Sequence, residues 1–387
     1  MGKLHQKLSP GEIILPGDAG PHPSSNVEWW YYFAFLKGDK GGNYATMASF
    51  FRIGEPKFFK GHYLIFSLVD LDRYTHRTFS LLDTKAAVYM LFFIPYDLLL
   101  DPLDKRMWRL CYNLLKGKLP YPHKKLENIN VQQMPTRLVY GNNYLSFVNR
   151  SEDCFVAHLA EEEIKIDLNF IPQKPIALVG GEGKPNQLYY YSFPRNQVEG
   201  RIRNGQVVEN VTGTGWFDHQ WGRSHTLTFK TGWDWFGIQL NDGRELLMNR
   251  FNSIKNGDSF RPMANLIDCS GNVFFTRNVE YYPVRYWKSP FTKAVYPLDW
   301  QIVIPEFYMK MKVCPYFSMQ EAPIIGPLHA IWEGACFMSG EEMVTNQKVR
   351  EIFGAGYMEL VGYANDIGSQ NSVGKTKVDR PNSRRRP

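Results

Sequence analysis

The sequence lacks the features that define several protein classes. Its 387 residues include only five cysteines, and they are widely spaced with no C-x-x-C pair. An odd number of isolated cysteines argues against a disulfide framework and against a cysteine-rich zinc site. The longest apolar run, Ala86 to Ile94, is half of the ~18 residues that a membrane-spanning helix needs. The N-terminal segment has no apolar core of a secretory signal, so we expect a cytoplasmic protein.

Nucleotide and metal motifs are also missing. The glycine-rich run that begins at Gly180 is followed by Pro185, where a phosphate loop needs Ser or Thr. The nine histidines form no H-E-x-x-H or H-x-H pair. His219 and His225 lie close in sequence, but no obvious carboxylate accompanies them as a third metal ligand. We therefore expect neither a cofactor nor a metal.

The positive charge is concentrated at one end of the chain. The net charge is +7, and residues 371–387 hold six Lys and Arg against the single acid Asp379. The rest of the chain therefore carries only a small excess of positive charge. Positive charge gathered in a terminal tail does not form a basic surface on the folded protein, so no nucleic-acid partner is expected. Residues 368–387 are predicted to be a disordered tail.

Aromatic residues are abundant, at 15% of the chain, and they favour β-structure and apolar or planar ligands. Most of the sequence consists of short strand-like runs separated by polar or glycine turns, and Asn241-Asp242-Gly243 is a strong hairpin signal. Such a pattern predicts an all-β fold of antiparallel barrels or sandwiches. A shift of the sequence by 204 residues places Trp29 on Trp233 and Tyr31 on Trp235, which suggests two similar β-units in tandem.

One segment departs from this pattern, at residues 86–118. Asp101 and Pro102 could begin a helix that Gly117 ends. Leu103, Met107, Leu110, Cys111 and Leu114 fall at helical spacing, with Lys and Arg on the other faces. The segment from 102 to 116 is therefore predicted to be a basic amphipathic helix. It could pack on the outside of a barrel, cover a lipophilic pocket as a lid, or contact a membrane surface.

Carboxylates recur inside aromatic strands. Because side chains alternate along a strand, Glu28, Trp30 and Tyr32 should share one face, with Trp29 and Tyr31 on the other. The other candidates are Asp218, His219 and Trp221, the pair of tryptophans around Asp234 (Trp233 and Trp235), Glu333, and Tyr357 with Glu359. Buried acids often only tie strands together, and that reading competes with a functional one at each position.

Acids among aromatic rings suit chemistry on hydrocarbons. A carboxylic acid with a raised pKa can protonate an alkene, and aromatic faces stabilise the resulting cation. A base such as His219 would then deprotonate the attacking water. A cyclase without proton transfer needs only an apolar mould and a hydrogen-bond donor.

Six motifs together resemble the family of carotenoid hydratases (hydroxyneurosporene synthases) and AttH-like proteins. They are NVEWWYYFAFL from Asn26, GTGWFDHQWG from Gly213, GWDWFGIQLNDG from Gly232, YPLDW from Tyr296, IWEGA from Ile331 and GAGYMELVGY from Gly354.

The resemblance implies two tandem lipocalin-like units, residues 1–223 and 224–367, with a ligand cavity near their junction. Family members include hydratases of isoprenoid double bonds, and more distant fungal relatives are intramolecular Diels–Alder cyclases. The resemblance also implies catalytic roles for His219 and Trp221. The helical segment at 86–118 departs from plainer members of the family.

Our leading hypothesis is a cofactor-independent lyase or cyclase of an apolar isoprenoid or polyene. Asp218 and His219 would be its acid–base pair, Trp221 a catalytic aromatic residue and Glu28 a second acid or an orienting group. Substrate would lie against the residues Trp30, Tyr32, Trp233, Asp234, Trp235, Glu333 and Tyr357. The alternatives are a pericyclase, in which proton transfer plays little part, and a lipophile carrier without catalysis.

Overall fold

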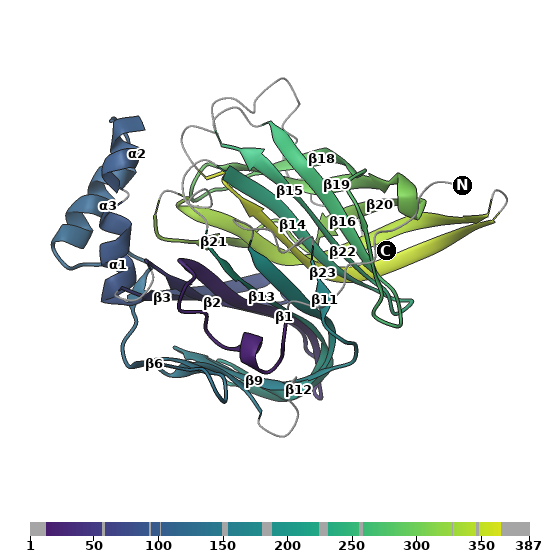
Figure 1. Ribbon diagram of the computed structural model, residues 1–387, viewed down its shortest axis with the longest axis horizontal. Coiled ribbons are helices and arrows are strands. Elements are labelled where there is room, and N and C mark those ends of the chain that lie inside the picture. Colours follow the sequence, from purple (N-terminus) through teal and green to yellow (C-terminus); the bar gives the residue numbers. More distant parts are fainter. Residues whose placement is uncertain are drawn as a thin grey trace.

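Two curled antiparallel sheets face each other in the computed structural model, and a small helical unit lies beside them (Figure 1). The structure describes residues 13–55, 59–92, 94–100, 102–148, 154–179, 188–223, 231–254, 258–326, 328–345 and 348–364. The predicted C-terminal tail, residues 368–387, and the start of the second predicted unit, residues 224–230, lie outside the described residues.

The first sheet is built from residues 27–222 and has the strand order β5-β4-β3-β2-β1-β13-β12-β10-β9-β8-β7-β6, with β11 paired to β12. Its strands are β1 Val27–Gly38, β2 Asn43–Ile53, β3 Gly61–Asp70, β4 Thr75–Leu82, β5 Lys124–Lys125, β6 Ile129–Gln132, β7 Arg137–Tyr140, β8 Asn143–Phe147, β9 Phe155–Glu161, β10 Ile164–Pro172, β11 Ala177–Leu178, β12 Tyr189–Asn204 and β13 Val207–Gly222. All neighbours are antiparallel except the short pair of β4 and β5.

The second sheet has the order β17-β16-β15-β14-β23-β22-β20-β19-β18, with β21 paired to β22. Its strands are β14 Thr231–Leu240, β15 Glu245–Ser253, β16 Ser259–Ile267, β17 Val273–Thr276, β18 Glu280–Lys288, β19 Val295–Ile304, β20 Met309–Pro315, β21 Glu321–Pro323, β22 Ala330–Thr345 and β23 Lys348–Val361. The predicted Asn241-Asp242-Gly243 hairpin joins β14 to β15, and Gly243 has the positive φ of +88° that a tight turn requires.

The two sheets repeat one topology. In each, the first strand lies between the second strand and the last: β1 between β2 and β13, and β14 between β15 and β23. The register agrees as well, because Tyr31 pairs with Asp218 and Trp235, its counterpart after the shift of 204, pairs with Glu359. The predicted all-β fold of two tandem lipocalin-like units is confirmed.

Strand alternation divides the core into layers. Trp30, Tyr32 and Ala34 belong to the core inside the first sheet, whereas Tyr31 and Phe33 belong to a layer between the two sheets. The alternation expected for β1 is therefore confirmed. The second sheet has its own apolar core. It also contributes to the shared layer, which we call the inter-sheet layer.

The helical segment contains three helices: α1 Thr84–Leu91, α2 Ile94–Leu100 and α3 Lys105–Leu115. The predicted start of the amphipathic helix at Pro102 is wrong. Asp104 caps α3 instead, because its carboxylate accepts hydrogen bonds from the backbone N–H groups of Arg106 and Met107. Leu103 precedes the helix and is 86% exposed, so it is not part of the buried face. Gly117, with a φ of +67°, follows the helix end as predicted.

The helical unit touches both halves of the molecule. Met107, Leu110 and Leu114 of α3 pack in a cluster with Tyr63 of β3 and with Ile325, which follows β21 in the second half. The Tyr63 hydroxyl also accepts a hydrogen bond of 3.1 Å from the backbone N–H of Ile325. Within the described residues, no helix has the length and apolarity needed to cross a membrane.

Asp104→Ala tests the cap of α3. The substitution removes the acceptor of two helix-terminal N–H groups, which costs about 0.5–2 kcal/mol at typical N-caps. We expect faster amide hydrogen exchange in α3 and little change in β1, measured by mass spectrometry. Asp299→Ala, at an exposed ion pair of the second sheet, is the matched control. Equal exchange of α3 in both variants would contradict the assignment of the cap.

Candidate functional site

Asp218 and His219 are neighbours on β13, and for that reason their side chains point to opposite faces of the first sheet. Asp218 faces the inter-sheet layer, where it contacts Tyr190, Ser192 and Trp216. His219 faces the interior of the first sheet, beside Trp30. The two side chains therefore do not form the adjacent acid–base pair that the sequence suggested. They belong to two separate clusters.

The cluster around His219 is centred on Glu28. The Glu28 carboxylate lies 3.2 Å from Nε2 of His219, 2.8 Å from Nδ1 of His22 and 2.9 Å from the guanidinium of Arg52. His22 stacks on Trp221 with ring centroids 4.0 Å apart. The cluster joins β1, β2, β13 and the segment that precedes β1.

The protonation of Glu28 follows from these contacts. Burial alone would raise the pKa of Glu28, but the hydrogen bonds and charges of His219 and His22 outweigh it and lower the pKa to about 2. Glu28 is therefore ionised at neutral pH and cannot donate a proton. Of the two roles expected for it, this environment favours the orienting one.

Among the described residues, His22, Glu28 and His219 could in principle bind a metal, since their ligand atoms lie within 4.8 Å of one another. Arg52 already forms an ion pair with the same carboxylate. A divalent cation would be repelled by that guanidinium, and Glu28 has its charge balanced without one. The donor set therefore fits a buried ion-pair network better than a metal site.

Asp218 has a different environment. Its carboxyl group accepts hydrogen bonds from the hydroxyls of Tyr190 (2.6 Å) and Ser192 (2.5 Å) and from the indole N–H of Trp216 (2.6 Å). No Lys or Arg of the described chain forms an ion pair with it. Burial raises the pKa of Asp218 to about 6, although the three hydrogen bonds act in the opposite direction. A protonated acid is thus available near neutral pH.

Two glutamates of the second sheet belong to the same layer. Glu333 of β22 and Glu359 of β23 are direct cross-strand partners. The Tyr31 hydroxyl donates to Glu333 (2.7 Å), and the Trp233 indole N–H donates to Glu359 (3.2 Å). These two donors come from β1 and β14, so the pair is held by both sheets.

Burial raises the pKa of both glutamates. The pKa of Glu333 rises well above its usual range, and the charge of Glu359 adds to the rise. The pKa of Glu359 rises to about 7 through burial, with a further contribution from the charge of Asp218. Two neighbouring buried carboxyl groups cannot both ionise without a large free-energy cost. At neutral pH Glu333 therefore holds a proton, and Glu359 changes between its charged and neutral forms.

The internal repeat explains where these acids lie. Tyr31 and Trp235 are equivalent positions, and their partners on the last strand of each sheet are Asp218 and Glu359. Two residues before each acid stands an aromatic residue, Trp216 or Tyr357, and both belong to the inter-sheet layer. The repeat therefore brings one acid from each half into a shared aromatic environment.

The other predicted substrate-binding residues divide between the layers. Trp233, Trp235, Glu333 and Tyr357 lie in or against the inter-sheet layer. Trp235 donates its indole N–H to the Tyr190 hydroxyl (3.2 Å). Trp30 and Tyr32 instead lie in the core of the first sheet, so the structure does not bring them to the Asp218 side.

Asp234 points away from the inter-sheet layer. It is fully buried, forms an ion pair of 2.7 Å with Arg250 and accepts a hydrogen bond of 2.8 Å from Tyr363. The Arg250 guanidinium in turn lies 4.8 Å from the ring centroid of Trp300. These contacts give Asp234 a structural role inside the second sheet.

Asp234→Ala should destabilise the protein strongly, because it leaves the buried charge of Arg250 without a partner. Removing one member of a buried ion pair costs about 3–5 kcal/mol, and we expect a loss of that size in the free energy of unfolding measured with urea. Tyr363→Phe removes only the hydrogen bond and should cost about 1 kcal/mol. Similar, small losses in both variants would contradict the structural role.

Sequence reasoning missed three side chains that hold Asp218, namely Tyr190, Ser192 and Trp216, and gave Glu359 no role in the site. Part of the signal was available, since Trp216 and Asp218 are two apart on one strand, as are Tyr357 and Glu359. The partners on β12 could not be inferred, because the pairing of Ser192 with Asp218 depends on the register of two long strands.

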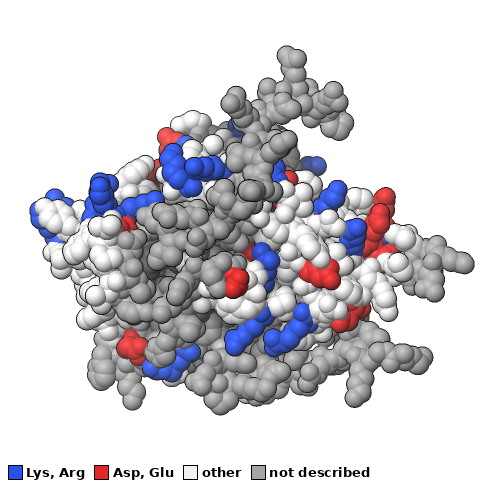
Figure 2. Space-filling model, turned by 90° about the horizontal axis from the view of Figure 1, so that it is seen from above, with Lys and Arg blue, Asp and Glu red and all other residues white. Residues whose placement is uncertain are grey.

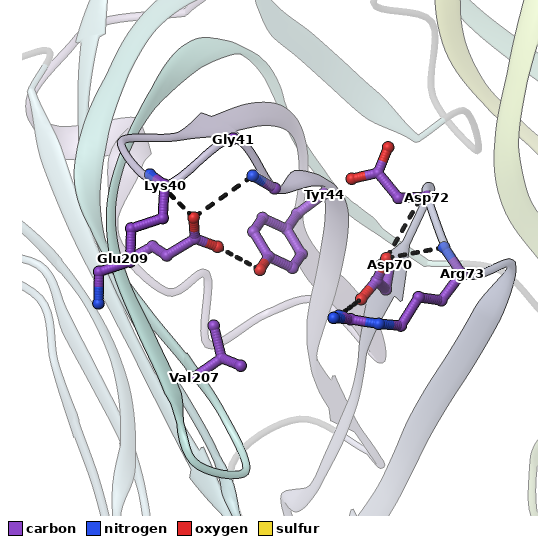
Figure 3. Close-up of a pocket in the computed structure, with 9 residues that line it drawn as sticks. Lys40, Gly41, Tyr44, Asp70, Asp72, Arg73, Val207 and Glu209 are labelled. Atoms are coloured by element: carbon purple, nitrogen blue, oxygen red, sulfur yellow. Dashed lines mark hydrogen bonds and ion pairs between the residues drawn. The ribbon is translucent and has the colours of Figure 1, made fainter.

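A pocket of about 300 Å³ lies elsewhere, near the turn between β1 and β2 (Figure 3). There Glu209 accepts hydrogen bonds from the backbone N–H of Lys40 and the hydroxyl of Tyr44, and Asp70 pairs with Arg73. The polar groups in the pocket thus satisfy one another. None of the predicted site residues lines it.

Comparison with known proteins now identifies the family. The family model described as AttH-like matches residues 121–363. The chain belongs to the AttH-like family. The resemblance read from the sequence motifs is thereby confirmed. No match was found among curated proteins.

Solved structures share the fold. A Nitrosomonas europaea protein assigned as an AttH has 24% identity and a TM-score of 0.67, over 92% of this chain and 99% of that one. Kievitone hydratase from Nectria haematococca has 16% identity and a TM-score of 0.65, over 93% and 97%. CghA with Sch210972 has 10% identity and a TM-score of 0.51, over 90% and 93%.

Proposed function

We propose that this AttH-like protein is a cofactor-independent hydratase of an apolar isoprenoid or polyene, and that Asp218 is its proton donor. The observation that carries the proposal is a buried carboxyl group with a pKa of about 6, held by three donors within an aromatic layer. Kievitone hydratase shares this fold, and we infer from its name that water addition is a reaction that such a fold can host.

In the proposed reaction the Asp218 carboxyl group transfers its proton to one alkene carbon. The resulting cation is stabilised by the rings of Trp233 and Trp235. Water adds its oxygen to the cation, and Glu359 accepts the proton that the water loses. Glu359 replaces His219 as the base, because His219 lies on the other face of β13 and Glu359 shares the inter-sheet layer with Asp218.

Tyr190 lies between Asp218 and Trp235. Its hydroxyl donates to Asp218 and accepts the indole N–H of Trp235, and the charges of both Asp218 and Glu359 act on it. The Trp235 contact directs the Tyr190 proton towards Asp218. Tyr190 is thus a positioning residue for Asp218. Between turnovers Asp218 regains a proton and Glu359 loses one by exchange with solvent.

Asp218→Asn should lower turnover at least about 100-fold, since general acid catalysis is typically worth 10²–10⁴-fold. The substrate is first identified by comparing apolar metabolites of source cells with the gene intact and deleted. The reaction is then run in D₂O and analysed by mass spectrometry. We expect a product heavier by one water, with one carbon-bound deuterium. Asp299→Asn is the matched control.

Two other outcomes would replace the proposal. A product that is an isomer of its precursor and carries no deuterium, with full turnover in Asp218→Asn, would identify a pericyclase. An apolar ligand recovered chemically unchanged from the purified protein, with no metabolite altered by the deletion, would identify a carrier.

The pH profile tests the two carboxyl groups separately. Asp218 must be protonated and Glu359 ionised, and the pKa of the acid (about 6) lies below that of the base (about 7). Turnover should therefore have a maximum between these two values and fall on its alkaline side as Asp218 ionises. Ser192→Ala removes a hydrogen bond that favours the carboxylate and should therefore move this falling limb to higher pH. Ser146→Ala, at a partly buried serine far from the acids, should leave it in place.

On the acid side of that maximum turnover should fall as well, because Glu359 becomes protonated and can no longer accept a proton. Glu359→Gln should abolish this second limb and lower turnover. A low-pH limb that persists in Glu359→Gln and disappears in His219→Gln would return the base role to His219.

A further inference from the structure

The outer face of the helical unit carries apolar side chains that no described part of the molecule covers. On α3, Trp108, Tyr112 and Leu115 are 54%, 58% and 71% exposed. Their spacing of four and three residues places them on one side of the helix. The opposite side, with Met107, Leu110 and Leu114, is the side that packs on the protein. Helix α3 therefore has a second apolar stripe, which we call the outer stripe.

The rest of the unit shows the same feature. Phe92 after α1 and Leu99 in α2 are 72% and 79% exposed. Isolated exposed apolar residues are ordinary, but several large ones within one small unit are typical of an interaction surface.

The charge of the helical unit restricts the kind of partner that its outer face can bind. Residues 84–118 contain six Lys and Arg, three Asp and no Glu. At helical spacing, Lys105, Arg109 and Lys116 flank the outer stripe on one side, and the Lys116 ammonium lies 4.1 Å from the centre of the Tyr112 ring. Figure 2 shows Lys and Arg side chains at the left edge of the molecule, the side on which the helices lie in Figure 1.

The unit also lies next to the inter-sheet layer. Ile324 and Ile325 pack on the helices. Ile324 and Leu328 belong with Trp233 to a further apolar cluster, and Trp233 donates to Glu359. Apolar contacts therefore run from the helices to the proposed catalytic acids.

We propose that the helical unit docks this protein on the surface of an anionic lipid bilayer. The outer stripe enters the boundary between headgroups and acyl chains, where Trp and Tyr rings are favoured. Lys105, Arg109 and Lys116 contact the anionic headgroups. A lipophilic substrate dissolved in the membrane would then reach the protein at the end nearest Trp233. The docking does not depend on which reaction the acids perform.

Sedimentation with lipid vesicles tests the proposal on the full chain. We expect wild type to bind vesicles of phosphatidylcholine mixed with phosphatidylglycerol, to bind pure phosphatidylcholine less well, and to lose the difference at high salt. Trp108→Ser with Leu115→Ser should weaken binding to both vesicles at least about ten-fold. Replacing Lys105, Arg109 and Lys116 with Gln should weaken only binding to the anionic vesicles, about five-fold per residue.

Phe291→Ser is the matched control, because Phe291 is 72% exposed on the β18–β19 turn of the second sheet. Urea unfolding of each variant confirms that it is folded. Wild type that binds neither vesicle, or equal losses in the control and in the stripe variant, would overturn the proposal. So would a wild-type dimer in analytical ultracentrifugation that the stripe variant dissociates, since the stripe would then cover a second copy of this chain.

Discussion

Three carboxyl groups lie between the two sheets without a cationic partner in the described chain: Asp218, Glu333 and Glu359. Burying an ionised carboxyl group without a cationic partner costs free energy. Burial therefore favours the neutral form of these groups and raises their pKa values. Hydroxyl and indole donors satisfy their oxygens instead. The contrast with Glu28 and Asp234 is instructive, because those two acids are paired with Arg52 and Arg250. The molecule thus separates acids that join strands within one sheet by ion pairs from acids between the sheets that can exchange a proton.

This separation depends on alternation along single strands. On β13, Asp218 faces one environment and His219 the other; on β14, Trp233 and Trp235 face the inter-sheet layer while Asp234 faces the core of its own sheet. A change of register by one residue would exchange these roles. The long antiparallel pairs of β13 with β1 and β12 are what keep each acid on its own side.

The helical unit also has two faces with different surroundings. Its inner face is fixed by contacts with both halves, through Tyr63 and Ile325. Its outer face remains apolar and basic at once. With docking at a bilayer, the helices would supply the membrane contact, and the inter-sheet layer would supply an apolar environment for a substrate taken from that membrane.

The sequence by itself determined the all-β class, the tandem repeat, the family and the faces of β1, because composition, alternation and motifs are local properties of the chain. It also identified Asp218 as a candidate acid. The Asn241-Asp242-Gly243 hairpin places Asp234 opposite Arg250, so that ion pair depends on local register. Only the tertiary structure decided that His219 belongs with Glu28 and His22, and that Tyr190, Ser192 and Glu359 surround the layer that Asp218 faces. Those partners are distant in sequence, and strand register and the packing of one sheet on the other bring them together. No spacing along the chain encodes either arrangement.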